Sequence, residues 1–203
     1  MRRVDLYLLF SFDLAGSSRL KAQAFEDFHW VEFVQYFHSQ CRRLIAHFGV
    51  EHAQLWKYDG DAILFYQRIG TAYEVEHSIR AIDRVLAAFQ RELGESQRYA
   101  AAADVISIRA VAWTAPVVSH VEAVPAKMAA LVERLEEANS LTHDKMIHDP
   151  ESHGVDFIGP NIDTGFALAA DARELQITIS AELADFLRGS DRPMLDAIIE
   201  AGN

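Results

Sequence analysis

The chain has little cysteine, few basic residues and no long apolar run, and each shortage excludes a class of protein. Cys41 is the only cysteine in 203 residues, so no intrachain disulfide can form and we expect a reducing compartment. It falls on an apolar helical stripe, which favours a buried filler over a nucleophile.

Lysine and arginine total 19 against 30 aspartate and glutamate, a formal net charge of -11. Nucleic-acid surfaces depend on a basic excess, so we expect neither a nucleic-acid nor an anionic-membrane partner.

No stretch reaches the length of a membrane span, and the short apolar run after the two N-terminal arginines lacks the features of a signal peptide. We therefore expect a cytoplasmic protein. Hydrophobic residues make up 50% of the chain and charged residues 24%, which is ordinary for a globular domain. The length suits one domain that covers residues 1–203.

Apolar periodicity predicts an ordered series of strands and helices in the first part of the chain. Strand-like apolar runs lie at residues 4–12, 51–57, 62–68 and 106–118, and helical steps of three and four lie at 25–48 and 75–93. An Asp-Gly turn joins the second and third strands. The resulting order, β-α-β-β-α-β, predicts an α+β fold with a ferredoxin-like split βαβ sheet and helices packed on it.

The remainder of the chain predicts further elements. We expect a helix over 126–138, an irregular polar stretch over 139–154, a strand or loop over 155–163, a helix over 164–172, a strand over 175–180 and a short helix over 181–189. The polar stretch contains His143, His148 and His153. Their spacing of five does not fit the helical i,i+4 pairs of zinc sites, so we expect surface or loop histidines.

Two aspartates stand where predicted strands run into turns. Asp13 ends the first strand, before a Gly/Ser turn, and Asp61 lies in the hairpin turn. Two carboxylates at strand ends can share hard divalent ions such as Mg²⁺ or Mn²⁺. The backbone amides of residues 14–18 can form a nest for phosphate oxygens, since Gly16 permits close approach. Aspartates are also ordinary turn formers, so from the residues alone both interpretations stay open.

Three segments resemble the motifs of class III nucleotide cyclases, and the resemblance spans residues 4–180. The segments are LLFSFDLAGSSRLK (8–21), LWKYDGDAILFY (55–66) and FIGPNIDTGFALA (157–169). In that family an aspartate ends the first strand, a Gly-Asp-Ala hairpin supplies a second aspartate, and a Gly-x-x-x-Asn block precedes a helix. The resemblance implies the class III cyclase fold, two divalent metal ions, a nucleoside triphosphate substrate and a head-to-tail homodimer with active sites at the interface.

The resemblance also implies roles for individual residues. Asp13, Asp61 and the carbonyl of Leu14 match the metal ligands, and Lys57 and Asp156 match the base-reading pair of adenylate cyclases. Further substrate contacts are expected from Leu14, Ala15, Gly16, Ser17, Ser18 and Trp113.

Three features depart from the family pattern, and one is the strand RAVAWTA (109–115), where the family has a sequence like RIGIHTG. Asp163, a catalytic candidate, replaces the family's asparagine, and Ala167 replaces the arginine that stabilises the transition state. Losing that guanidinium lowers the expected rate about a hundredfold or more. Arg173 is a candidate to compensate, nearly two helical turns further on.

The segments AVAWTAP (110–116) and IGPNIDTGF (158–166) are similar in sequence to motifs of the pyrimidine cyclases of bacterial Pycsar anti-phage defence. That resemblance implies UTP or CTP as substrate, cyclic UMP or cyclic CMP as product, and a separate effector that senses the product. Strand alternation places Trp56 and Tyr58 on a face opposite Lys57, so we expect Trp113 to narrow the base pocket. The alternatives are an adenylate cyclase, which Lys57 and Asp156 also allow, and a catalytically weak regulatory domain, which Ala167 favours.

Overall fold

The computed structural model describes residues 4–23, 29–50, 52–118, 144–149 and 154–190. In chain order the elements are β1 (Val4–Ala15), α1 (Ser17–Gln23), α2 (Trp30–His47), β2 (Gln54–Asp59), β3 (Ala62–Ile69), α3 (Ala72–Glu95), the 3-10 turn η1 (Ala100–Ala102), β4 (Ser107–Val118), β5 (Asp144–Asp149), β6 (Gly154–Ile158), α5 (Pro160–Ala169), β7 (Ile177–Ile179) and α6 (Ala181–Ser190). No helix among the described residues is both long enough and apolar enough to cross a membrane.

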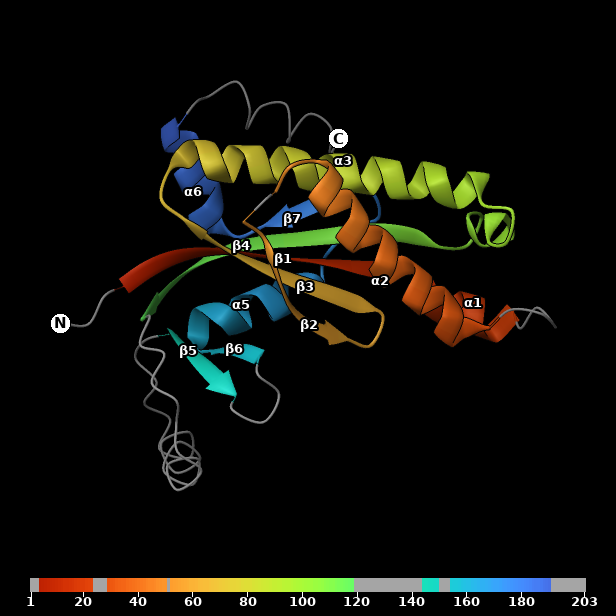
Figure 1. The fold of residues 1–203 in the computed structure, drawn as a ribbon, viewed down its shortest axis with the longest axis horizontal. Helices are drawn as coiled ribbons and strands as arrows, with labels where there is room; N and C mark the ends of the chain where they lie inside the picture. The colour runs from red at the N-terminus through yellow and green to blue at the C-terminus, as the bar shows by residue number, and fades with distance from the viewer. Residues whose placement is uncertain (1–3, 24–28, 51, 119–143, 150–153, 191–203) are drawn as a thin grey trace.

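The strands form one sheet in the order β2-β3-β1-β4-β5-β6, and β7 pairs with β4. The central strand β1 runs antiparallel to both β3 and β4. Because β3 lies between β1 and β2, the first βαβ unit is split, and the predicted α+β fold is confirmed. Figure 1 shows α5 beside the short strands β5 and β6, away from the long helix α3.

Strand β1 is buried on both faces, which explains its almost continuous apolar sequence. Leu8, Phe10 and Phe12 pack into the main core with residues of α2, α3 and α6. Tyr7 and Leu9 point the other way, into a second cluster that includes Ile162 of α5. Successive side chains of a strand alternate between faces, so the odd-numbered residues of β1 lie on the α5 side of the sheet.

The two long helices carry the apolar stripes that their periodicity predicts. The buried residues of α2 are Phe33, Phe37, Cys41, Leu44 and Ile45. Complete burial raises the pKa of the Cys41 thiol well above its usual value, which agrees with its predicted role as filler. Helix α3 begins with a capping box, in which Thr71 and Glu74 exchange side-chain-to-backbone hydrogen bonds. Backbone donors from Gly70 and Thr71 lower the pKa of the Glu74 carboxyl.

Two predicted boundaries are wrong. Residues 144–149 form strand β5, which pairs parallel to β4 and antiparallel to β6, inside the stretch predicted as irregular. Backbone pairing with β4 and β6, rather than an alternation of apolar residues, defines β5 as a strand. Helix α5 begins at Pro160, four residues before the expected start at 164, because proline suits the first helical turn. The predicted helix over 126–138 lies outside the described residues, as do His143 and His153.

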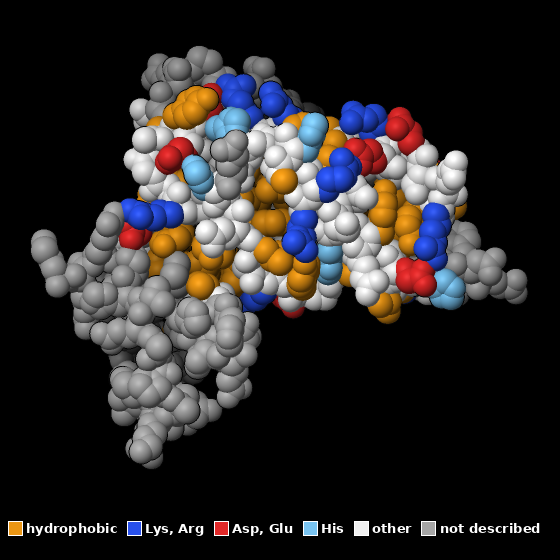
Figure 2. All heavy atoms as spheres, viewed as in Figure 1, with side chains coloured by type: hydrophobic (Ala, Val, Ile, Leu, Met, Phe, Trp, Pro, Cys, Tyr) orange, Lys and Arg blue, Asp and Glu red, His pale blue; other side chains and the backbone are white. Residues whose placement is uncertain are grey.

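Charged side chains are mixed on the face drawn in Figure 2. Lys and Arg side chains lie apart from one another among Asp, Glu and apolar groups, without merging into a broad basic area on that face.

Candidate active site

Asp13 and Asp61 lie next to each other where β1 and β3 meet the hairpin turn. Asp13 pairs with Ala62 across the β1–β3 ladder, and Asp61 directly precedes Ala62. Gly60 has a φ of +59°, a left-handed conformation that glycine adopts without strain, and it closes the turn. Burial is the main cause that raises the pKa of Asp13, and the negative charge of Asp61 adds to it. The structure therefore brings together the two aspartates predicted as metal ligands.

Arg109 on β4 is the ion-pair partner of Asp13, and no sequence motif predicts this role. The two residues face each other in the β1–β4 ladder. Arg109 donates to Oδ2 of Asp13 from Nε at 2.8 Å and also from Nη2, while Nη1 donates to the carbonyl of Ala172 at 3.3 Å. The guanidinium opposes the rise in the pKa of Asp13, but burial outweighs it. The Asp13–Arg109 pair follows from the antiparallel register of β1 and β4, and no motif in the linear sequence contains both residues.

The donors around Asp13 and Asp61 fit Mg²⁺ or Mn²⁺. Both side chains offer carboxylate oxygens, and the carbonyl of Leu14 follows directly on β1. A cation would offset the carboxylate repulsion that raises the pKa of Asp13. The described residues contain no group of three or more His, Cys, Asp or Glu side chains placed to hold a metal ion. A metal ion bound here would therefore need oxygen ligands from the two carboxylates, the backbone and a substrate, a mode of binding that is usual for Mg²⁺.

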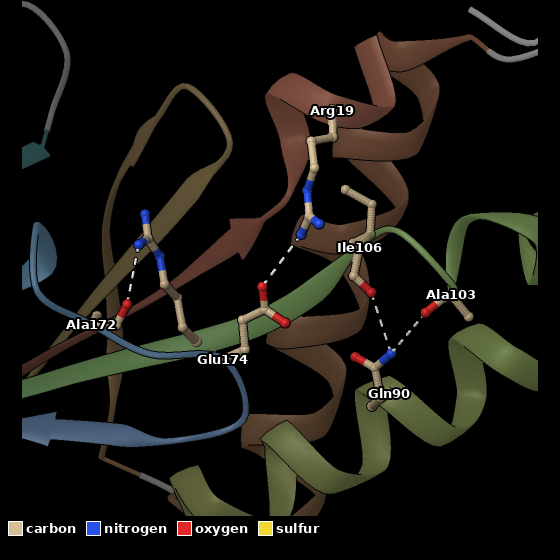
Figure 3. A network of polar contacts seen from close by, with 7 residues as sticks. Arg19, Gln90, Ala103, Ile106, Ala172 and Glu174 are labelled. Carbon is tan, nitrogen blue, oxygen red and sulfur yellow. Dashed lines mark hydrogen bonds and ion pairs between the residues drawn. The ribbon is translucent and has the colours of Figure 1, made fainter. Parts of the chain in front are cut away.

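The turn after β1 borders a cavity of about 590 Å³. The turn contributes Leu14, Ala15, Gly16, Ser17 and Ser18 to its lining, and the guanidinium-bearing residues there are Arg19, Arg109 and Arg173. Gly16 has a φ of +86°, and a Cβ at this position would lie 2.2 Å from the carbonyl oxygen of Val105. Glu174 approaches Arg19 at 3.5 Å (Figure 3). The cavity combines a tight glycine turn with three guanidinium groups, although Arg19 is paired with Glu174 and Arg109 with Asp13. Glycine turns and guanidinium groups can bind an anion.

Lys57 and Asp156 also meet, although 99 residues separate them. Lys57 Nζ lies 3.4 Å from Oδ1 of Asp156, and this contact joins β2 to β6. The same oxygen accepts hydrogen bonds from Trp56 Nε1 at 2.8 Å and from the backbone N–H of Phe157 at 2.9 Å. We call Trp56, Lys57, Asp156 and Phe166 the base cluster. None of these four residues lines the cavity beside Gly16.

A β-bulge in β2 overturns the expected side-chain alternation around Lys57. The β2–β3 register shifts between Leu55 and Lys57, which leaves Trp56 as the extra residue. Trp56 therefore lies on the same face as Lys57, and both contact Asp156. Tyr58 faces the other side, where its ring lies 4.7 Å from that of His38 on α2. The expectation that Trp56 and Tyr58 share a face opposite Lys57 is wrong.

The structure places Trp113 in the core beneath α5, where it is 1% exposed. The exposed aromatic residue of this region is Phe166, which is 38% exposed. Its ring centroid lies 6.0 Å from that of Trp56 and 6.3 Å from that of Trp113, and Lys57 Nζ lies 5.4 Å from it. Phe166 therefore stands between Trp113 and the open side of the base cluster. The sequence offered one clue to this position, the single glycine that precedes Phe166 in α5.

Gly165 is the residue that lets α5 approach Trp113. A Cβ there would lie 2.1 Å from the indole ring. We expect Gly165→Ala to lower the free energy of unfolding by about 2 kcal/mol, measured by urea denaturation, because overpacking forces the helix or the indole to move. Gly94→Ala in α3 is the control, since no atom lies within 4 Å of its added methyl group. The control should be slightly more stable than the wild type. A Gly165→Ala variant as stable as the control would contradict the close packing.

Asp163 and Ala167 are both exposed and lie one turn apart on α5. The backbone N–H of Asp163 donates to the carbonyl of Gly159 at the start of the helix. Arg173, the expected substitute for the missing arginine, lies instead in the cavity lining beside Gly16. Arg173 therefore lies beside the Gly16 turn rather than on the exposed face of α5.

Known proteins resemble this chain in fold and not in sequence. No family model matches it, and no curated protein sequence matches it. Among solved structures, its fold is that of nucleotide cyclase catalytic domains. The adenylyl cyclase CyaB from P. aeruginosa gives a TM-score of 0.59 at 12% identity, covering 93% of this chain and 83% of that chain. The guanylyl cyclase Cya2 gives 0.61 at 13% identity, covering 92% and 80%.

A third structure of this fold is the guanylate cyclase domain of RhGC from Catenaria anguillulae, solved in complex with GTP. Its TM-score is 0.58 at 12% identity, covering 91% of this chain and 83% of that chain. Each match covers more than nine tenths of this chain and about four fifths of the solved cyclase chain, so the predicted class III cyclase fold is confirmed. The activity has to be argued from the site.

Proposed function

We propose that this chain is a pyrimidine nucleotide cyclase, which converts UTP or CTP into the 3′,5′-cyclic monophosphate and pyrophosphate. The observation that carries the proposal is the Lys57–Asp156 pair, flanked by Trp56 and Phe166, on a fold shared with nucleotide cyclases. The paired aspartates and the arginine-lined cavity beside Gly16 supply the other groups that the reaction needs.

In this reaction the 3′-oxygen of the ribose attacks the α-phosphorus. A new O–P bond forms, the bond to pyrophosphate breaks and the hydroxyl proton passes to solvent. When bound, divalent ions on Asp13, Asp61 and the Leu14 carbonyl would activate the attacking oxygen and neutralise charge on the leaving group. The amides of residues 14–18 and the guanidinium groups of Arg19 and Arg173 hold the phosphate chain in place. The exposed carboxylate of Asp163 is the remaining catalytic candidate on α5.

The base cluster supports the proposal of a pyrimidine substrate. Lys57 can donate to a base carbonyl, and Asp156 can accept from a ring or exocyclic N–H. These groups suit adenine as well, so the size of the site must discriminate between the bases. Phe166 lies beside Trp56 and close to Lys57, and we propose that its ring limits the size of the base that can bind there. A pocket that leaves wrong bases with unpaired buried groups discriminates strongly.

The arrangement of groups within one chain also supports a symmetric homodimer. The proposed metal ligands Asp13 and Asp61 and the cavity beside Gly16 lie near the turns after β1 and β2, and the base cluster is a separate set of side chains. A head-to-tail dimer would join the metal half of one subunit to the base half of its partner, forming two equivalent sites.

Complementation tests this assembly. Asp61→Asn and Asp163→Ala chains should each be inactive alone, because every dimer then lacks one half of both sites. Mixed in equal amounts, they should recover about a quarter of wild-type activity, since half of the dimers are mixed and each holds one intact site. A strict monomer in light scattering that retains full activity would exclude the dimer.

We further propose a cytoplasmic second-messenger role in anti-phage defence, in which a separate effector senses the cyclic product. The support is the similarity of AVAWTAP and IGPNIDTGF to the Pycsar pyrimidine cyclases. The product, rather than a protein contact, would then carry the message.

Pyrophosphate release separates this proposal from its two alternatives. In separate reactions with UTP, CTP, ATP and GTP and with Mn²⁺, we expect release from UTP or CTP to be fastest. Fastest release from ATP would favour an adenylate cyclase. Release no faster than from the Asp61→Asn variant with every triphosphate would favour a regulatory domain, which Ala167 in place of arginine also suggests.

A further inference from the structure

The hydrogen bonds around Asp156 are uneven between its two carboxylate oxygens. Oδ1 accepts from Trp56 Nε1 at 2.8 Å, from the Phe157 N–H at 2.9 Å and from Lys57 Nζ at 3.4 Å. Within the described part of the chain, no hydrogen bond to Oδ2 is present alongside these three. The side chain is 51% exposed, so Oδ2 is the oxygen left for a ligand. A carboxylate with three donors on one oxygen is held in a single orientation.

Trp56 contacts both residues that read the base. Its indole N–H holds Asp156, and its ring lies beneath Lys57, whose Nζ is 4.4 Å from the ring centroid. The indole itself is 8% exposed and packs edge-on against Phe157, with centroids 5.2 Å apart. A buried, tightly packed indole is a rigid support. The β-bulge at Trp56 is what turns it toward these two partners.

We infer that Trp56 is a positioning residue for base recognition: its N–H fixes Oδ1 of Asp156 so that Oδ2 accepts the base N–H beside Lys57. This inference rests on the proposed function and extends it to the source of base selectivity. The ligand class is a base edge that presents an N–H next to a carbonyl or ring-nitrogen acceptor, as both pyrimidines do.

Trp56→Phe separates the hydrogen bond from the packing. Phenylalanine keeps an aromatic ring under Lys57 and against Phe157 but has no N–H for Asp156. Hydrogen bonds to charged groups have substantial net free energies, so we expect the KM for the preferred triphosphate to rise about tenfold. The preference for that triphosphate over the least-used one should fall by a similar factor, while kcat changes less than about twofold. A purely structural role would not alter the base preference.

Trp30→Phe is the matched control. Trp30 also carries a lysine over its ring, with Lys21 Nζ 4.1 Å from the centroid, but it lies on α2 outside the base cluster. The control should keep the wild-type KM and base preference. If the wild type is active and Trp56→Phe retains both values, the positioning role is excluded while the cyclase function stands.

The indole N–H resonance gives a readout that needs no activity. Three tryptophans give three signals in a nitrogen-15 spectrum. Asp156→Ala should shift the Trp56 signal and leave the Trp30 signal in place, since the indole N–H of Trp56 donates to Asp156. An unchanged Trp56 signal would overturn the inference even in an active enzyme. If no triphosphate is cyclised, the proposed function fails, and the inference is then decided by UTP titration. The Trp56→Phe variant must bind UTP more weakly than the Trp30→Phe variant. Equal UTP affinities, or no UTP binding, would reject the inference.

Discussion

Asp61→Asn should lower the rate of cyclisation about a thousandfold or more while leaving the fold intact. Asparagine keeps the shape of the side chain but removes one of the two carboxylates at the predicted metal site, and a loss of about 4 kcal/mol of transition-state stabilisation corresponds to that factor. The rate is measured as cyclic product per enzyme with saturating Mn²⁺. The thermal unfolding midpoint should stay close to that of the wild type, because the side chain lies at a turn rather than in the core.

Asp59→Asn provides the matched control in the same hairpin. Asp59 ends β2, is exposed and pairs with Ala62, the residue that follows Asp61. It carries the same charge but is not among the residues that match the metal ligands. This variant should keep most of the wild-type rate. Equal losses in both variants would indicate a general charge effect at the turn and would remove Asp61 from the metal site.

Ala167→Arg should raise the turnover about a hundredfold. Ala167 is exposed on α5, one turn after Asp163, at the position where class III cyclases resembling this chain carry the arginine of the transition state. A guanidinium that neutralises developing phosphate charge contributes about this factor. The gain should appear in kcat rather than in KM, because the charge develops only as the reaction proceeds.

Ala170→Arg is the control for added positive charge on the same helix. Ala170 is also exposed and forms the C-cap of α5. The Ala170→Arg variant should have the same kcat as the wild type. No gain in Ala167→Arg, with a stable fold, would show that this chain stabilises its transition state differently, and Arg173 beside the Gly16 turn would then be the first residue to test.

The sequence predicts the part of the fold that local patterns specify. Apolar periodicity locates β1, β3, α3 and β4 because each has a strongly apolar face or core. Strand β5 is not predicted from the sequence, because its pairing with β4 and β6 defines it as a strand. Local sequence carries no record of such partners.

The candidate site likewise contains residues that the sequence predicts and residues whose role depends on the folded structure. Asp13, Asp61, Lys57 and Asp156 follow from motif resemblance, and the structure brings each pair together. Arg109 depends on register, and a chain must be folded before its position opposite Asp13 is apparent.

Trp56 and Trp113 depend on packing that no local pattern encodes. Trp56 is turned by a one-residue bulge that reverses strand alternation. Trp113 is buried because Gly165 allows α5 to lie directly on it, which leaves Phe166 exposed in its place. Each difference arises from contacts between segments that are distant in the sequence.

The central claim is tested most directly by the identity of the cyclic product. The wild-type chain is incubated with equal concentrations of UTP, CTP, ATP and GTP and with Mn²⁺, and the cyclic nucleotides are quantified by mass spectrometry. The Lys57–Asp156 pair beneath Phe166 predicts cyclic UMP or cyclic CMP as the dominant product, with none from Asp61→Asn. A product mixture dominated by cyclic AMP or cyclic GMP would contradict the pyrimidine assignment, and no cyclic product at all would contradict the enzyme itself.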